Sequence, residues 1–254
     1  PHADRCWEWR ATRTPPATSS PSSSSPSSSS SPPGIVARAK TWALDRVVGY
    51  HAFELALYLG AHEPRLVPHV NRVFARALFS KARAARGPSR AMFNFDCLFK
   101  QHGDEWAIPI ERTLEELVRL RALIDERGFH AHLPVEVRFV KRDDAWLSPS
   151  EGRDSCYIGV IAYRPYGRDT AHEAYFAAFE ELMLALDGRP HWAKRFGPDA
   201  AVLRARYPRF DDFAALRATL DPDGVFTNAC IERVLGAPAT PDAQDAQDAH
   251  EEAA

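Results

Sequence analysis

The segment PVEVRFV, residues 134–140, decides the fold expected for this chain. Apolar side chains alternate in it with Glu136 and Arg138, which is the pattern of a β-strand. Because successive side chains of a strand point to opposite faces, the two charges share one face, about 7 Å apart. Antiparallel sheets commonly carry one polar face in water. At this point the charged face is therefore either a solvated surface or one wall of a binding site.

Further elements are predicted on both sides of this segment. FNFDCLFKQ (Phe93 to Gln101) alternates apolar residues on one face, and DSCYIGVIAYRP (Asp154 to Pro165) is rich in β-branched and aromatic residues, so both are predicted strands. Between them, Pro109 is expected to open a helix that Gly128 closes. The predicted apolar stripe of this helix consists of Ile110, Leu114, Leu117, Leu120 and Ile124.

Two more helices are predicted toward the C-terminus. Thr170 and Glu173 have the spacing of a capping box, and Gly188 follows the helix that they begin. The apolar face of that helix consists of Tyr175, Phe176, Phe179, Leu182, Met183 and Leu186. A final helix ends at a DPDG turn and carries Phe210, Phe213, Leu216 and Leu220. The order strand, helix, strand, strand, helix predicts an α+β fold with an antiparallel sheet covered by helices on one face.

Length and charge limit the function classes. A chain of 254 residues with 45% hydrophobic content can bury a core in one or two domains. Its formal net charge is -2, from 32 basic and 34 acidic residues. Five acidic residues lie in residues 237–254, so the rest of the chain has 32 basic and 29 acidic residues, or +3. Nucleic-acid binding needs a concentrated basic face, and this composition argues against it.

Several kinds of site are excluded by missing motifs. No Gly-x-Gly occurs, so a Rossmann fingerprint and a P-loop are absent, and there is no GxSxG elbow. His130 and His132 have no third ligand nearby in the sequence, so no metal site is expected. A disulfide framework or a zinc site is also not expected, because no CxxC pair links the cysteines Cys6, Cys97, Cys156 and Cys230.

Two apolar segments raise the question of a membrane. WALDRVVGYHAFELALYLG (Trp42 to Gly60) contains charged residues, which are costly at the centre of a bilayer, so we predict a buried or interfacial helix. LVPHVNRVFARALF (Leu66 to Phe79) adds an apolar segment that contains arginines. The two segments either pack in a core or lie on a membrane surface. The sequence opens at Pro1 without an apolar leader, so no secretory signal is expected, and the missing initiator Met indicates truncation at the front.

Charged residues outside the helices suggest a polar ligand. In a water-poor cleft, Arg138 offers a planar fork of donors and Glu136 accepts from hydroxyl groups, which suits a polyhydroxy ligand. Lys194, in the loop GRPHWAKRFG, is either solvated or desolvated by its aromatic neighbour, and a desolvated lysine stabilises nearby negative charge. Asp143 and Asp144 are interpreted as turn residues rather than catalysts.

Five blocks of the sequence carry a resemblance. In chain order they are FNFDCLFKQHGDEWAIPIE, AHLPVEVRFVKRDDAWLSP, RDSCYIGVIAYRPYGRD, GRPHWAK and LDPDGVFTNACIERVLG. Together they resemble the C-terminal half of the L-gulonolactone oxidase and D-arabinono-1,4-lactone oxidase family, the FAD-linked sugar-1,4-lactone oxidases. The resemblance runs from about Trp42 to Gly236, and PHAD at the front is similar to a strand of that family.

The resemblance implies a flavoprotein of the vanillyl-alcohol-oxidase type, with an FAD domain that is missing here and a mixed α and β substrate domain. The family's Glu-x-Arg falls on Glu136 and Arg138, which would face the sugar lactone. Its HW-x-K lysine falls on Lys194, near the flavin, and His191 is implied as a weaker cofactor contact, with the placing of Trp192 as its alternative role. Sugar oxidation toward an ascorbate-type product is the implied activity, with Arg138 positioning the substrate and Glu136 orienting Arg138.

The expected organisation has four parts. Residues 1–16 form a short N-terminal piece of the substrate domain, and residues 17–34 form a disordered Ser/Pro linker. The C-terminal substrate domain spans 35–236, with a segment that returns to the flavin from about 189, and 237–254 are a disordered acidic tail. The resemblance implies attachment to the endoplasmic reticulum or a mitochondrial membrane, with the cytoplasm as the other location. The alternative function is an inactive fragment that serves as a membrane-surface or interaction module.

Overall fold

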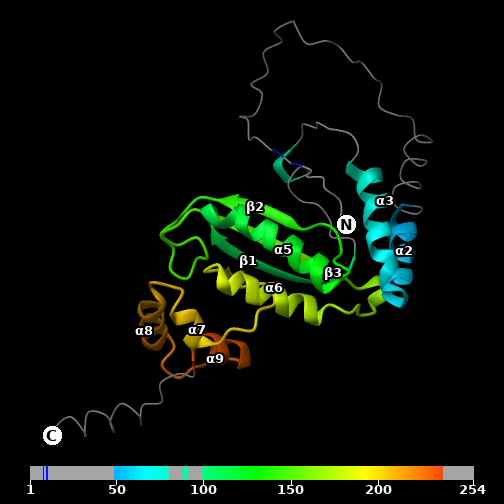
Figure 1. The fold of residues 1–254 in the computed structure, drawn as a ribbon. Coiled ribbons are helices and arrows are strands. Elements are labelled where there is room, and N and C mark those ends of the chain that lie inside the picture. The colour runs from blue at the N-terminus through cyan, green and yellow to red at the C-terminus, as the bar shows by residue number, and fades with distance from the viewer. Residues whose placement is uncertain (1–7, 9, 11–48, 80–87, 91–98, 237–254) are drawn as a thin grey trace, which may run out of the picture. The chain divides into compact units, whose positions relative to one another are not determined.

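The computed structural model describes residues 8, 10, 49–79, 88–90 and 99–236 of the chain (Figure 1). The backbone forms two compact units, each made of several segments. The first unit comprises residues 1–101, 130–133 and 162–171. The second unit comprises residues 102–129, 134–161 and 172–254 and contains most of the sheet.

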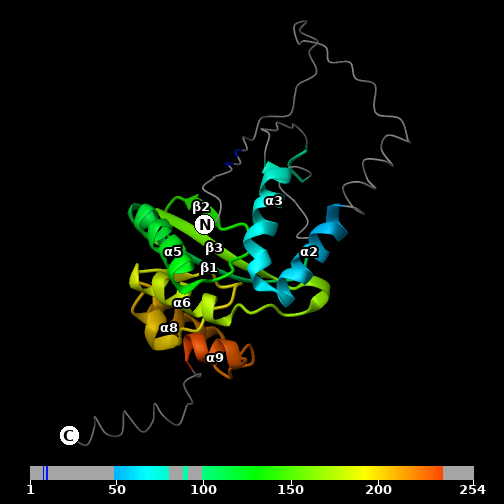
Figure 2. The same ribbon diagram turned by 45° about the vertical axis from the view of Figure 1, so that its right-hand side comes forward.

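The first unit is built on a pair of helices. Helix α2 (Tyr50–His62) and helix α3 (Val67–Phe79) are joined by the short 3-10 helix η2 (Pro64–Leu66), and they lie side by side (Figure 2). Phe53 of α2 packs its ring 4.3 Å from that of Phe74 and 5.7 Å from that of Tyr163. These apolar contacts explain why the predicted helix around Phe53 is stable despite its charged residues.

No helix in the described ranges is long and apolar enough to cross a membrane. Phe53 and Leu57 are buried on one side of α2, whereas Leu55 and Leu59 are about half exposed. The predicted helix over residues 42–60 is thus partly confirmed, as α2, and its residues 42–48 lie outside the described part of the chain.

Within the described residues, the sheet has four strands in the order β2-β3-β1-β4. Their bounds are β1 (Gln101–Pro109), β2 (Glu136–Val140), β3 (Ser155–Tyr163) and β4 (Arg189–Pro190). The pairs β2 with β3 and β1 with β4 are antiparallel. Backbone bonds from Ile110 to Asp154 (3.1 Å) and from Arg164 to Lys100 (2.8 Å) show that β1 and β3 are antiparallel too.

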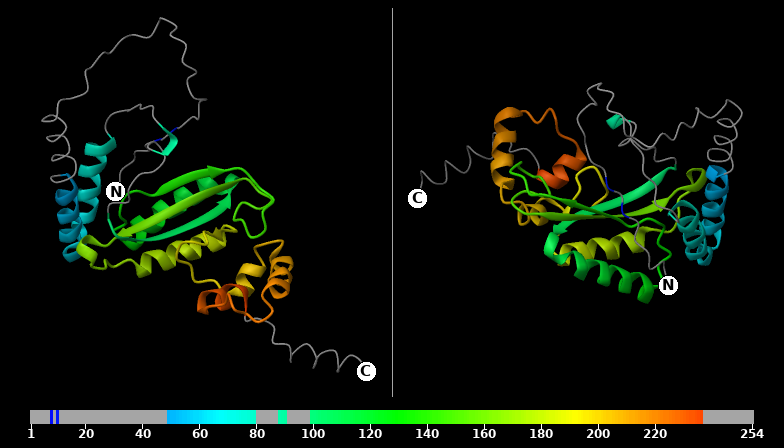
Figure 3. Two further views of the ribbon diagram at one scale, coloured as in Figure 1. Left: turned by 180° about the vertical axis from the view of Figure 1, so that it is seen from behind. Right: turned by 90° about the horizontal axis from the view of Figure 1, so that it is seen from above.

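Helices α5 (Thr113–Arg127) and α6 (Glu173–Ala185) lie on one side of the sheet (Figure 3). The core between the layers is dense, because Trp106 and Ile108 of β1 and Phe179 and Met183 of α6 are 0% exposed. The predicted α+β fold with an antiparallel sheet is confirmed, and so is the buried apolar face of α6.

The region around β1 departs from the prediction. The strand predicted over residues 93–101 overlaps β1 only at Gln101, and residues 93–98 lie outside the described part of the chain. Pro109 ends β1 instead of opening a helix, because a 3-10 turn, η3 (Ile110–Arg112), intervenes before α5. Gly128 closes α5 as predicted, in the left-handed region at φ 65°.

The buried stripe of α5 is also different. Leu120 and Ile124 are buried as predicted, but Leu114 is 75% exposed, and Glu116 is 0% exposed in the place of an apolar residue. Ile110 and Leu117 are half-buried. The predicted stripe is therefore confirmed toward the C-terminal end of α5 and wrong at Leu114, where Glu116 takes the buried position.

The predicted capping box before α6 is not formed. Glu173 is the first helical residue, and its carboxylate accepts from the backbone N–H of His172. The hydroxyl of Thr170 donates to the carbonyl of Tyr163 at 3.0 Å and does not cap the helix.

Up to residue 236, where the described part of the chain ends, three helices follow β4 instead of one final helix. They are α7 (Ala200–Arg204), α8 (Phe210–Leu220) and α9 (Ala229–Leu235). The DPDG turn closes α8 as predicted, with the N–H of Gly224 donating to the carbonyl of Asp221 at 3.1 Å. Asn228 then caps α9 by accepting from two backbone N–H groups at 3.0 Å.

Candidate functional site

Glu136 and Arg138 lie on the same face of the sheet, and it is the face away from α5 and α6. In the register of β2 with β3, Glu136 stands opposite Gly159 and Arg138 stands opposite Tyr157. A Cβ added at Gly159 would lie 3.7 Å from Cγ of Glu105 and 3.7 Å from Cβ of Glu136. Side chains from β1 and β2 therefore meet above Gly159 of β3, and we call this surface the polar face.

The guanidinium of Arg138 donates from Nη2 to a carboxylate oxygen of Glu105 on β1. The side chain of Glu105 is 4% exposed, and that of Arg138 is 57% exposed. Partial burial lowers the pKa of Arg138, but the hydrogen bond and charge of Glu105, with the charge of Glu136, raise it above its usual value. The partner that orients Arg138 is therefore Glu105, where the sequence pointed to Glu136.

Lys194 reaches the polar face from the loop after β4. Its Nζ lies 3.7 Å from the position of a Cβ added at Gly103. Gly103 and Glu105 are two residues apart on β1, so they face the same side of the sheet. Lys194 is exposed, and among the described residues no carboxylate forms an ion pair with it.

His191 fixes the turn that presents Lys194. Its backbone N–H donates to the carbonyl of Glu105 at 2.9 Å, and its carbonyl accepts from the N–H of Lys194 at 2.9 Å. The imidazole Nδ1 accepts from the N–H of Ala193 at 3.1 Å, so one ring nitrogen is used inside the turn. Trp192 packs elsewhere, because its indole N–H donates to the carbonyl of Leu147 at 2.6 Å.

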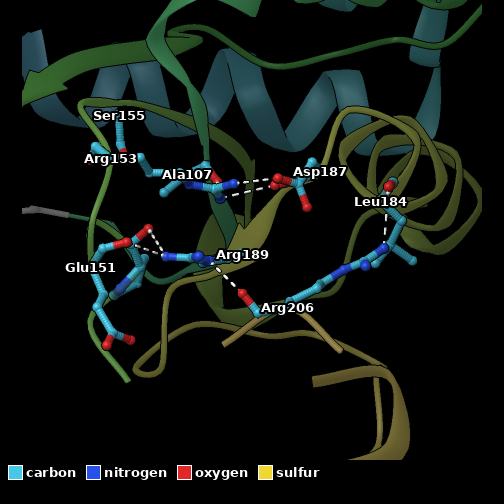
Figure 4. A network of polar contacts seen from close by, with 9 residues as sticks. Ala107, Glu151, Arg153, Ser155, Leu184, Asp187, Arg189 and Arg206 are labelled. Carbon is cyan, nitrogen blue, oxygen red and sulfur yellow. Dashed lines mark hydrogen bonds and ion pairs between the residues drawn. The ribbon is translucent and has the colours of Figure 1, made fainter. Parts of the chain in front are cut away.

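A network of buried and half-buried arginines holds β4 and this loop in place (Figure 4). Arg189 is 6% exposed and donates to the carbonyls of Glu151 and Arg206, each at 2.8 Å. Arg153 donates to the carboxylate of Asp187 at 2.5 Å and to its carbonyl at 2.8 Å. Burial lowers the pKa of both Arg153 and Arg189. These bonds anchor the start of the loop that carries His191 and Lys194.

Two further buried carboxyls lie on the helix side of the sheet and are separate from the polar face. Asp104 is 2% exposed and accepts from the indole N–H of Trp106 at 2.8 Å. Burial raises the pKa of Asp104 to about 7, against the lowering effect of that hydrogen bond. Burial also raises the pKa of Glu116 to about 8.

The histidine and aspartate motifs have structural roles. In the described residues, no group of three or more His, Cys, Asp or Glu side chains is placed to hold a metal ion. His132 is buried, and its Nδ1 accepts from the N–H of Tyr163 at 2.8 Å. Asp143 accepts from the N–H of Ala145 at 3.1 Å and from the hydroxyl of Ser148 at 2.7 Å, as predicted for a turn residue. Of the cysteines, Cys156 and Cys230 are described and free.

Comparison with known proteins identifies the family. The family model of D-arabinono-1,4-lactone oxidase matches residues 1–234. An L-gulonolactone oxidase of Scyliorhinus torazame is 43% identical over 202 residues, which cover 79% of this chain and 46% of the relative. The L-gulonolactone oxidase of Mus musculus is 41% identical over 198 residues, covering 78% and 45%.

A bacterial relative gives the same result. An L-gulono-1,4-lactone dehydrogenase of Mycobacterium tuberculosis is 41% identical over 177 residues, which cover 70% of this chain and 40% of the relative. The chain thus spans about half the length of the curated relatives that it matches. Since the family model covers nearly the whole sequence, the chain belongs to the D-arabinono-1,4-lactone oxidase family.

Proposed function

We propose that this chain is the C-terminal part of an FAD-dependent sugar-1,4-lactone oxidase that acts on L-gulono-1,4-lactone or D-arabinono-1,4-lactone in the formation of an ascorbate-type product. The observation that carries the proposal is the polar face, where Glu136, Arg138 and Lys194 come together from β2 and from the loop after β4. Membership of the family and the names of the relatives support the substrate class.

In this proposal the sheet and its helices belong to a substrate domain of the vanillyl-alcohol-oxidase type. Residues 35–236 form that domain, with residues 1–16 as a short N-terminal piece of it. Residues 17–34 serve as a linker, residues 237–254 as a tail, and the segment from about 189 returns to the flavin. The anchoring of β4 by Arg189 suits such a segment, because a loop that meets a cofactor needs a fixed base.

Arg138 and Glu136 are assigned to the lactone. Oxidation of a sugar hydroxyl breaks a C–H bond with loss of a hydride, releases the hydroxyl proton and leaves a carbonyl group. Arg138 retains N–H donors beyond the one that binds Glu105, and these would hold and polarise the substrate oxygen. The exposed carboxylate of Glu136 would accept from a neighbouring sugar hydroxyl.

Lys194 and His191 are assigned to the cofactor side. FAD, when bound, accepts the hydride from the sugar carbon. The fit of the residues to such a group rests on Lys194, an exposed cation at the end of the polar face whose ammonium group would offset negative charge on the flavin. His191 contributes mainly by shaping the turn that carries Lys194.

Lactone binding to the isolated chain tests the proposal. Titration of the isotopically labelled chain with L-gulono-1,4-lactone, followed by NMR, is expected to shift resonances of β2 and of residues 191–195. Arg138→Ala should abolish these shifts, whereas Arg142→Ala, which removes an exposed arginine just beyond β2, should leave them unchanged. Shifts of equal size in all three proteins would contradict the proposed site.

A second candidate function, binding to a membrane surface, is supported by exposed side chains of the first unit. Leu55 and Leu59 lie one turn apart on α2 and are 50% and 49% exposed, and Val73 on α3 is 61% exposed. Arginine side chains lie close by in the sequence, with Arg65 89% exposed. Exposed apolar residues next to cations are suited to an anionic membrane surface. This function is compatible with the first.

A further inference from the structure

The ion pair between Arg138 and Glu105 crosses a whole strand. Arg138 is on β2 and Glu105 is on β1, and β3 lies between them. Neighbouring strands are about 4.8 Å apart, so the two backbones are separated by about 10 Å. Arg138 stands opposite Tyr157 of β3, which lies on the same face, so the Arg138 side chain must run along β3 past Tyr157 to reach Glu105.

Gly159 is the next residue after Tyr157 on that face of β3, and it lies beside Glu105. It stands opposite Glu136, and the direction of its missing side chain points between Glu105 and Glu136. An alanine Cβ would fit there, since the nearest atoms are 3.7 Å away, which is an ordinary contact distance. A branched side chain would extend further, into the space that the ion pair occupies.

Glu105 is the fixed end of the pair. It is buried on an inner strand, and its carbonyl also accepts from His191 at the base of the Lys194 turn. Arg138 is on the edge strand β2, whose five residues are all exposed. An arginine side chain has many rotamers, and a bond to a fixed carboxylate selects among them.

We propose that Glu105 is a positioning residue for the lactone site, and that Gly159 provides the gap through which it holds Arg138. The inference rests on the proposed function, because it assumes that Arg138 meets the sugar. Glu105 itself is not assigned a contact with substrate. The same residue would set the distance between Arg138 and Lys194, since its side chain holds one and its backbone supports the turn of the other.

Four variants of the full 254-residue chain test this assignment. Glu105→Gln keeps the shape and removes the charge, and Glu105→Asp keeps the charge but shortens the reach. Gly159→Val fills the gap, and Gly159→Ala is its matched control. The first readout is the exchange rate of the Arg138 Nη2–H protons with water, measured by NMR, because Nη2 is the donor to Glu105. Exchange should be slow in the unaltered chain and in Gly159→Ala, and at least tenfold faster in the other three variants.

The second readout is the affinity for L-gulono-1,4-lactone. We expect losses of about tenfold in Glu105→Gln and Gly159→Val and no change in Gly159→Ala. Heteronuclear spectra that match the unaltered chain outside the polar face show that each variant is folded. A merely structural ion pair would change stability but would not change lactone affinity in folded variants.

The two hypotheses fail in different ways. Absence of lactone binding by the unaltered chain contradicts the proposed function, and the exchange of the Arg138 Nη2–H protons then decides by itself whether Glu105 holds Arg138. Lactone binding that persists at full strength in folded Glu105→Gln and Gly159→Val overturns the positioning role and leaves the proposed function standing.

Discussion

Replacement of Glu116 by Gln is expected to remove a pH dependence from the stability of the second unit. Glu116 is 0% exposed, and neither of its carboxylate oxygens has a hydrogen-bond partner in the described part of the chain. Burial raises its pKa from the usual 4.5 to about 8. Between these two values the folded protein keeps a proton that the unfolded chain has released. The free energy of unfolding therefore falls as the pH rises through this window.

The slope approaches about 1.4 kcal/mol per pH unit, so the loss from about pH 5 to about pH 7.5 is about 3 kcal/mol. Glu116→Gln buries a neutral amide of the same shape at every pH. It should match the unaltered chain in stability near pH 5 and exceed it by about 3 kcal/mol near pH 7.5. The hydroxyl of Tyr175 is also buried without a hydrogen-bond partner among the described residues. Its cost is the same in both proteins and does not affect their difference in stability.

Urea unfolding at several pH values measures this effect, and the difference between the two proteins cancels every other titrating group. Glu115→Gln is the matched control, because Glu115 is the preceding residue, is 45% exposed and forms ion pairs with Arg112 and Arg119. The control should keep the pH slope of the unaltered chain. A stability difference between the unaltered chain and Glu116→Gln that stays constant with pH would refute the reasoning.

Three more outcomes are expected. Gly188→Ala should lower the free energy of unfolding by about 1–3 kcal/mol, because the new Cβ would lie 2.6 Å from the carbonyl oxygen of Met183. Urea unfolding measures this loss, and Gly159→Ala should be nearly neutral in the same assay. The chain purified alone should retain no stoichiometric flavin and oxidise no lactone, and a flavin absorption spectrum in the purified protein would contradict this. In liposome flotation the chain should bind vesicles that contain phosphatidylserine, and Leu55→Glu should reduce binding; equal flotation of both proteins would count against the second candidate function.

Part of the fold can be predicted from the sequence, because some elements bury only one face and their apolar residues then recur with a regular period. The apolar residues of α6 recur with the helical period, and all of the predicted ones are buried. Strand β1 cannot be predicted in this way. Five consecutive residues, Asp104 to Ile108, are buried, so no alternation of apolar and polar residues marks it as a strand. Its correct assignment requires knowing that it is a central strand with neighbours on both edges.

The candidate site could likewise be predicted only in part from the sequence. The common face of Glu136 and Arg138 follows from the two-residue period of a strand, and the structure places them so. Glu105 comes 33 residues before Arg138, and only the register of three strands brings the two together. A local pattern cannot carry that information, which is why Glu136 was the expected partner of Arg138. The adjacent acids in GDEW were the available signal, since two charges inside a buried strand need partners.

Asp104 and Glu105 are buried carboxyl groups on opposite faces of β1, and each has a partner of a different kind. Asp104 points to the helix side, where a hydrogen bond from Trp106 is its main compensation, and burial raises its pKa to about 7. Glu105 points to the polar face, where Arg138 neutralises it directly. Burial of a carboxylate is costly without a cation or donors, and the two neighbours therefore have different roles. The paired acid fixes a cation on the polar face, while the acid on the helix side is held mainly as a packed, hydrogen-bonded group.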